Sequence, residues 1–168
     1  MVSMTLFQHR MVFAHHLDVH CKKQLFARIC AELHPLISVE SDDMDEAGEA
    51  EEPAHDLASQ FLQRERLGTT AIGRGIALPH IVISDLDEPI CCITTVKKAI
   101  DFDAADGRKV DLFGLLLLPE ASSVLAAAQL EQMRALLTQR GLRTRLRFVK
   151  NAAELEALFT EELNQRAA

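Results

Sequence analysis

The chain has 168 residues, of which 48% are hydrophobic, and a net charge of -7. That length is typical of one domain, and the apolar fraction is sufficient for a packed core. Eight of the 25 acidic residues lie between Glu40 and Glu52, a run without Lys or Arg, and the other 17 nearly balance the 18 basic residues. This charge distribution and the absence of Trp and Tyr argue against a nucleic-acid partner.

The residue pattern also argues against a membrane-spanning protein and a secreted protein. The strongest apolar run, Leu112 to Pro119, is far shorter than the roughly 20 residues of a membrane span, and the N-terminus does not read as a signal peptide. The four cysteines form no CxxC pair. The adjacent Cys91 and Cys92 would point to opposite faces of a strand, so reduced thiols in the cytoplasm are expected.

The first half of the chain predicts a short strand followed by two helices. We expect the strand at 16–19 and a helix from His20, which apolar residues at helical spacing support until Pro35 ends it. We interpret the acidic segment 40–53 as a solvated insertion. A second helix is expected from Asp56, its N-cap, to about Arg66.

The second half alternates strands with helices. A turn-rich segment with a strand near Ile76 leads to His80; further strands are expected at 90–96 and 110–118, with a turn at Asp106-Gly107 between them. A helix is expected at 123–139, ended by Gly141, and two more at 142–148 and 153–163. This order predicts one α/β domain over 1–168 with a mixed sheet and a core at about 17–163.

His80 is the leading candidate for chemistry. It follows Gly73, Gly75 and Pro79, and glycines let a backbone approach a ligand closely while their amides can hold phosphate oxygens. An imidazole is a nucleophile when one ring nitrogen is free and the other is held by a partner. On these residues alone, a single histidine at the end of a strand is more often structural. Arg64 and Arg66 precede this segment and suit phosphate contacts, or are solvated arginines at a helix end.

Other chemistries lack support in the sequence. His16 and His20 are four residues apart but lie in a segment expected to be extended, so no metal site is predicted. The GRG pattern does not complete a dinucleotide fingerprint, and no phosphate-binding GxxxxGK[ST] motif is present. We therefore expect neither a metal nor another cofactor.

Two stretches carry a family resemblance. RERLGTTAIGRGIALPH and DFDAADGRKVDLFGLLLLPE resemble the fructose/mannitol-type enzyme IIA (type 2) of the bacterial phosphotransferase system, nearest to its nitrogen-regulatory branch. The resemblance covers about 17–159. It implies a three-layer α/β/α domain of the mannitol enzyme IIA kind, with a mixed sheet.

The resemblance also implies roles for individual residues. His80 corresponds to the histidine phosphorylated at Nε2, and Arg64 to the arginine of the motif. Thr69 and Thr70 correspond to a pair beside the active site that orients the imidazole or binds phosphate. The implied donor is a carrier protein of the HPr type, which makes the chain a phosphotransferase component with a phosphohistidine intermediate.

The sequence departs from the family pattern in three places. Ile81 and Val82 follow His80 where the family often has Gly-Lys, and Ala71 and Arg74 change the loop. The third departure is a missing second histidine at the start of the helix after LLLLPE, where Ala126 is the best alignment. We expect a nitrogen-type regulatory protein that acts on target proteins. The alternatives are a sugar-specific enzyme IIA that passes phosphate to a permease IIB domain, and a binding module that is not phosphorylated.

Overall fold

The computed structural model describes residues 10–37, 53–121 and 123–167, with the side chains from Leu57 onward in the second range. The acidic run therefore lies outside the described residues. The elements, in chain order, are β1 (Met11–Leu17), α1 (Lys22–Ile37), α2 (Pro53–Leu67), β2 (Ala71–Gly73), β3 (Ile76–Ala77), β4 (His80–Ile83), β5 (Ile90–Ile100), β6 (Val110–Pro119), α3 (Ser123–Leu137), α4 (Arg140–Phe148) and α5 (Ala152–Ala167).

The six strands form one mixed sheet with β6 at its centre. β5 pairs with β6 antiparallel along one edge and with β1, parallel, along the other. The opposite edge of β6 is shared, because β3 pairs with its first half and β4 with its second half, both parallel. β2 continues the sheet beyond β3. Nine of the ten residues of β6 are buried, as the apolar sequence predicts for a strand covered on both faces.

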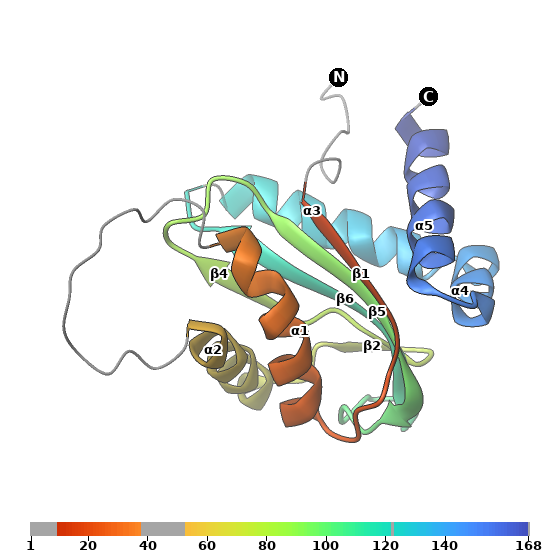
Figure 1. Ribbon diagram of the computed structural model, residues 1–168, viewed down its shortest axis with the longest axis horizontal. Coiled ribbons are helices and arrows are strands. Elements are labelled where there is room, and N and C mark those ends of the chain that lie inside the picture. Colours follow the sequence, from red (N-terminus) through yellow and green to blue (C-terminus); the bar gives the residue numbers. More distant parts are fainter. Residues whose placement is uncertain (1–9, 38–52, 122, 168) are drawn as a thin grey trace.

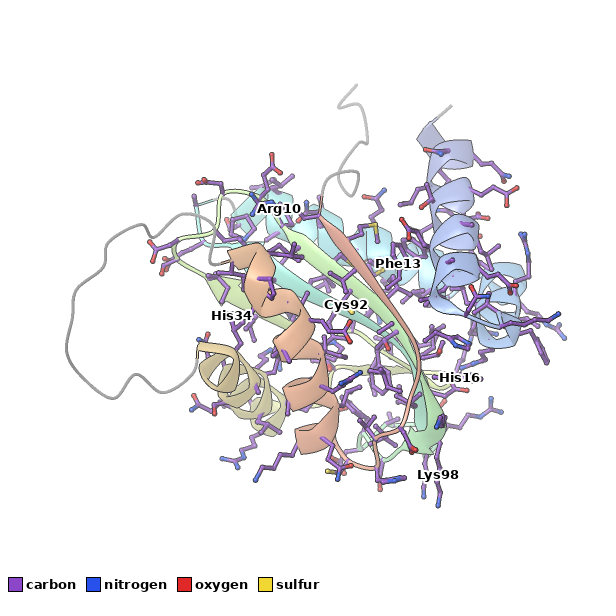
Figure 2. The ribbon with its side chains drawn as sticks, in the orientation of Figure 1. Arg10, Phe13, His16, His34, Cys92 and Lys98 are labelled. Atoms are coloured by element: carbon purple, nitrogen blue, oxygen red, sulfur yellow. The ribbon has the colours of Figure 1, made fainter. Side chains whose placement is uncertain are left out.

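Helices cover both faces of the sheet, which confirms the predicted α/β fold (Figure 1). α1 and α2 lie on one face, where Phe26 stacks on Phe61 at 5.1 Å between ring centroids. α3, α4 and α5 lie on the other, where Phe13 of β1 meets Phe159 of α5 edge-on (Figure 2). Each face has its own core cluster, and burial of these side chains is the main force that holds the layers together.

The adjacent cysteines of β5 belong to different layers. Cys92 joins the core beneath α1, and Cys91 joins the core on the α3 side, as the alternation of a strand predicts. Burial raises the pKa of the Cys30 thiol to about 12. All four cysteines are free, and three of them are buried.

Three predicted helix ends are wrong. Pro35 lies inside α1, which continues to Ile37, because a proline this close to the end removes only one hydrogen-bond donor. α2 begins at Pro53, so Asp56 is inside the helix and not its cap; proline is favoured at the first helical position. Gly141 lies inside α4, and the break comes at Gln139, which is extended with φ -63° and ψ 124°.

The strands also differ in extent from the prediction. The first runs over Met11–Leu17 and not 16–19, because Met11 to Ala14 pair with β5. The strand expected near Ile76 is confirmed as β3, whereas β2 before it and β4, which begins at His80 itself, were not predicted. Strands as short as these two carry too little alternation for sequence periodicity to detect. In the described part of the chain, no helix has the length and apolar character needed to cross a membrane.

Side chains of α3 pack tightly over Gly114 of β6, and this contact generates a stability prediction. A Cβ at this position would lie 3.0 Å from both Leu137 Cδ1 and Met133 Cγ. We expect Gly114→Ala to lower the free energy of unfolding by about 1–3 kcal/mol through overpacking. Urea unfolding followed by circular dichroism measures this change.

Gly141→Ala is the matched control, because an added Cβ there meets no atom within 4 Å. It should be neutral or stabilising by up to about 1 kcal/mol, since alanine is the better helix former. Equal stability of the two variants would contradict close packing of α3 on β6.

Candidate functional site

His80 is the first residue of β4 and stands where the neighbour of β6 changes from β3 to β4. It pairs with Leu116, and the carbonyl of Pro79 accepts a hydrogen bond from the Leu116 amide at 2.9 Å. The ring Nδ1 lies 2.8 Å from the carbonyl oxygen of Leu78. A carbonyl can only accept a hydrogen bond, so Nδ1 carries a proton, and in the neutral form of the ring the lone pair is then on Nε2. The half-buried ring is therefore held in the tautomer that a nucleophilic Nε2 requires.

Arg64 lies in the last turn of α2, and its Nη1 donates to the carbonyl of Gly68 at 3.1 Å. This bond lets the cation stabilise the C-terminal end of the helix and limits its rotamers. Arg64 lines the same cavity as His80, whereas Arg66 does not. The structure thus places at the cavity the arginine that the family resemblance singles out, Arg64, and leaves Arg66 outside it.

A buried carboxylate organises the loop that follows α2. Glu65 is only 6% exposed and accepts two hydrogen bonds from Thr70, from the backbone amide at 2.9 Å and from the hydroxyl at 2.7 Å. The Thr70 carbonyl in turn accepts from the Leu78 amide at 3.0 Å. A continuous path of hydrogen bonds therefore runs from Glu65 through Thr70 and Leu78 to the His80 ring.

Thr69 is engaged with backbone and not with the imidazole. Its hydroxyl donates to the Phe102 carbonyl and accepts from the Ala71 amide at 3.1 Å. Both threonines line the cavity, so the structure brings Thr69 and Thr70 near His80. No hydrogen bond joins either one to the ring in the described part of the chain.

The cavity has a volume of about 370 Å³ and is enclosed by α2, β2, the Leu78–His80 segment and α3. α3 contributes Ala127, Leu130, Glu131 and Arg134. Arg134 is a second cation at the site that sequence reasoning missed, because it is an ordinary exposed position on a helix 54 residues from His80. Its one sequence signal is its place one turn from Leu130 on the same helical face.

Two expected binding residues lie outside the cavity. Gly73 and Gly75 flank Arg74 in the turn between β2 and β3, and all three have positive φ, at 85°, 77° and 60° respectively. None of them lines the cavity. The glycines serve the tight turn, in a backbone region that side chains disfavour.

Of the two α3 residues near the place where a second histidine was expected, only Ala127 lines the cavity. Ala126 is 9% exposed and packs in the core, whereas Ala127 lines the cavity opposite His80. A side chain at 127 can therefore reach the site, and one at 126 meets the sheet. This correction falls within one helical turn of the alignment.

The arrangement suits an anion better than a metal. An imidazole and two guanidinium groups share one cavity with a single carboxylate, that of Glu131. Guanidinium groups are strong partners for phosphate oxygens. The histidines at 16 and 20 lie at the end of β1 and in the following loop, and the described residues contain no group of three side chains able to hold a metal ion.

Comparison with known proteins agrees with the sequence resemblance. The family model for the phosphoenolpyruvate-dependent sugar phosphotransferase system, EIIA 2, matches residues 5–162. A nitrogen regulatory protein of Pseudomonas aeruginosa is 36% identical over 111 residues, which cover 66% of this chain and 72% of that protein. The crystal structure of the nitrogen regulatory protein IIA-Ntr from Neisseria meningitidis superimposes with a TM-score of 0.73 at 25% identity, over 87% of this chain and 91% of that one. IIA mannitol from Escherichia coli shares the fold, with a TM-score of 0.65 at 15% identity and coverage of 87% and 94%.

A substitution of Glu65 tests whether its hydrogen bonds to Thr70 stabilise the loop that follows α2. We expect Glu65→Gln to lower the free energy of unfolding by about 1–3 kcal/mol, because an amide offers one acceptor where two buried donors of Thr70 need acceptors. Thermal and urea unfolding measure this loss. Glu156→Gln, an exposed change on α5, should stay within about 0.5 kcal/mol of wild type. Equal stability of both variants would contradict an organising role for Glu65.

Proposed function

Because the chain belongs to the EIIA 2 family of the phosphoenolpyruvate-dependent sugar phosphotransferase system, we propose that His80 accepts a phosphoryl group on Nε2 from a carrier protein of the HPr type. The observation that carries this proposal is the contact between Nδ1 and the Leu78 carbonyl at 2.8 Å. It leaves the lone pair on the other nitrogen of a ring that lines a cavity with two arginines.

The transfer needs no group beyond the two proteins. The Nε2 lone pair attacks phosphorus as the bond between phosphorus and the donor histidine breaks, and that electron pair returns to the donor ring. The proton on Nδ1 of His80 stays in its hydrogen bond, where the Leu78 carbonyl stabilises the positive charge that develops on the imidazole. In-line transfer leaves negative charge on the three equatorial oxygens, and Arg64 and Arg134 supply positive charge in the cavity.

The function that we propose is regulatory. The phosphorylation state of His80 would change the binding of target proteins, as in a nitrogen-type enzyme IIA. Similarity to nitrogen regulatory proteins supports this proposal. The proposal includes a cytoplasmic location, where the carrier would meet the protein. Four free thiols fit a reducing compartment.

A sugar-specific enzyme IIA is the second candidate, and its support is the fold shared with IIA mannitol. The two are distinguished by mixing the phosphorylated protein with a IIB domain and following the label. Fast transfer to IIB favours the sugar route. A protein that takes no label from the carrier would instead be a binding module.

His80→Ala tests the acceptor directly. With phosphorylated carrier as donor, wild type should gain one phosphoryl group, about 80 Da by intact-mass spectrometry, and the variant should gain none. His15→Ala is the matched control, since His15 donates to the Val149 carbonyl at the far end of the sheet and should leave labelling unchanged. Label retained in the His80 variant would place the acceptor elsewhere.

Arg64 and Arg66 form a matched pair on one helical turn. Arg64→Ala should fold normally but accept phosphate about 10²–10³-fold more slowly, the cost of one lost electrostatic donor. Arg64→Lys should recover part of the rate, because a lysine keeps the charge without the planar fork. Arg66→Ala should match wild type, since Arg66 lies outside the cavity. Rapid-quench labelling gives these rates, and equal rates for both alanine variants would remove Arg64 from the mechanism.

A further inference from the structure

Five arginines from three parts of the chain gather at one corner of the molecule, outside the His80 cavity. We call them the arginine cluster: Arg74 in the turn between β2 and β3, Arg108 before β6, and Arg140, Arg143 and Arg147 on α4. The sequence of α4, RGLRTRLRF, holds four arginines and no acidic residue. Positions 140, 143 and 147 fall on one face of that helix. Figure 1 shows α4 above the turn that joins β2 to β3.

The positive charges of the cluster act on one another. Partial burial, followed by the charges of Arg147, Arg74, Arg140 and Arg108, lowers the pKa of the Arg143 guanidinium. A guanidinium stays charged at neutral pH despite such a shift. The tertiary structure therefore concentrates at this corner a positive charge that the net charge of -7 conceals.

Arg147 is the structural member of the cluster. Its Nε and Nη2 donate to Asp111 Oδ1 at 3.0 Å and 2.7 Å, and Nη2 also donates to the Arg74 carbonyl at 2.7 Å. Gly75 leaves room for this contact, because a Cβ there would lie 2.6 Å from Arg147 Nη2. These bonds pin α4 to β6 and to the turn, and so they fix where the other arginines stand.

Asp106 and Asp111, the carboxylates that contact residues of the cluster, already accept hydrogen bonds. Asp111 pairs with Arg147, and Asp106 accepts the backbone amides of Arg74 at 2.8 Å and Arg108 at 3.1 Å. Arg143 donates to the Thr138 carbonyl at 3.1 Å. Within the described ranges, none of the other four arginines forms an ion pair; three are exposed and Arg143 is half-buried. Such a concentration of like charge opposes folding, and an anionic partner would relieve it.

An acidic peptide segment fits this surface better than a nucleic acid. A long polyanion would extend past the cluster over a molecule of net charge -7, and the chain has no Trp or Tyr on which bases could stack. A short run of Asp and Glu matches the compact cluster, and guanidinium groups bind carboxylates through two parallel hydrogen bonds. Phe148, 79% exposed at the end of α4, adds an apolar contact of the kind enriched with arginine at interfaces.

We propose that the arginine cluster is a docking site for an acidic segment of a partner protein, separate from the phosphorylation site. The proposal does not depend on phosphorylation of His80, because no member of the cluster lines that cavity. The same surface is available in a His80→Ala variant, so failure of one proposal leaves the other standing.

A fluorescein-labelled ten-residue poly-glutamate peptide is the probe, and fluorescence anisotropy at 50 mM and 150 mM salt is the readout. Wild type should bind the peptide, and more weakly at the higher salt. Arg140→Glu/Arg143→Glu should weaken binding at least about tenfold. Lys23→Glu/Arg28→Glu, which makes the same charge change on exposed positions of α1, should bind within about twofold of wild type, as should His80→Ala. Circular dichroism checks that each variant is folded.

Three results would overturn the proposal. The first is the absence of saturable peptide binding by wild type up to 1 mM. The second is equal weakening of peptide binding by the two double variants. The third is tighter binding of a ten-nucleotide single-stranded DNA through Arg140 and Arg143, which would assign the surface to nucleic acid. A wild-type dimer that the cluster variant abolishes, seen by sedimentation, would instead assign it to a second copy of the chain.

Discussion

The sharing of one edge of β6 between β3 and β4 determines where His80, the proposed phosphoryl acceptor, lies. β3 occupies the positions beside Leu112 and Phe113, and β4 those beside Leu116 to Pro119. The chain between them, Leu78 and Pro79, is held by hydrogen bonds to Thr70 and to Leu116. His80 follows at once, so its ring turns back to the Leu78 carbonyl at a point fixed by the most buried strand of the sheet.

The His80 cavity and the arginine cluster are both positioned by the same sheet, but the arginines have different roles in the two regions. In the His80 cavity, Arg64 and Arg134 come from helices on opposite sides of the sheet and leave space between them for an anion. In the arginine cluster, Arg147 is neutralised by Asp111 and fixes the geometry, while its neighbours keep their charge at the surface. A partner that docks at the cluster would therefore leave the His80 cavity unoccupied, because no member of the cluster lines that cavity.

Much of the fold could be predicted from local pattern. Long elements with strong periodicity, such as α1 and β6, were predicted close to their observed positions, and the α/β class followed from their order. The errors concentrate where one residue was given too much weight. Pro35 and Gly141 were interpreted as helix breaks, yet each lies in a terminal turn where few hydrogen bonds depend on it. The short strands β2 and β4, which were not predicted, depend on pairing with β3 and with β6, and no local window contains those partners together.

The sequence by itself indicated the candidate site. The motif around His80, with Arg64 and the two threonines, lies within 17 consecutive residues, so their proximity follows from the local chain and from the family resemblance. Tertiary structure alone decided which carbonyl holds the His80 ring, the entry of Arg134 into the cavity and the gathering of the arginine cluster. It also placed Ala127, and not Ala126, at the cavity. The physical reason is that these arrangements join residues from distant parts of the chain, or depend on how a helix is rotated against the sheet. Strand register and core packing set both, and neither is encoded in local spacing.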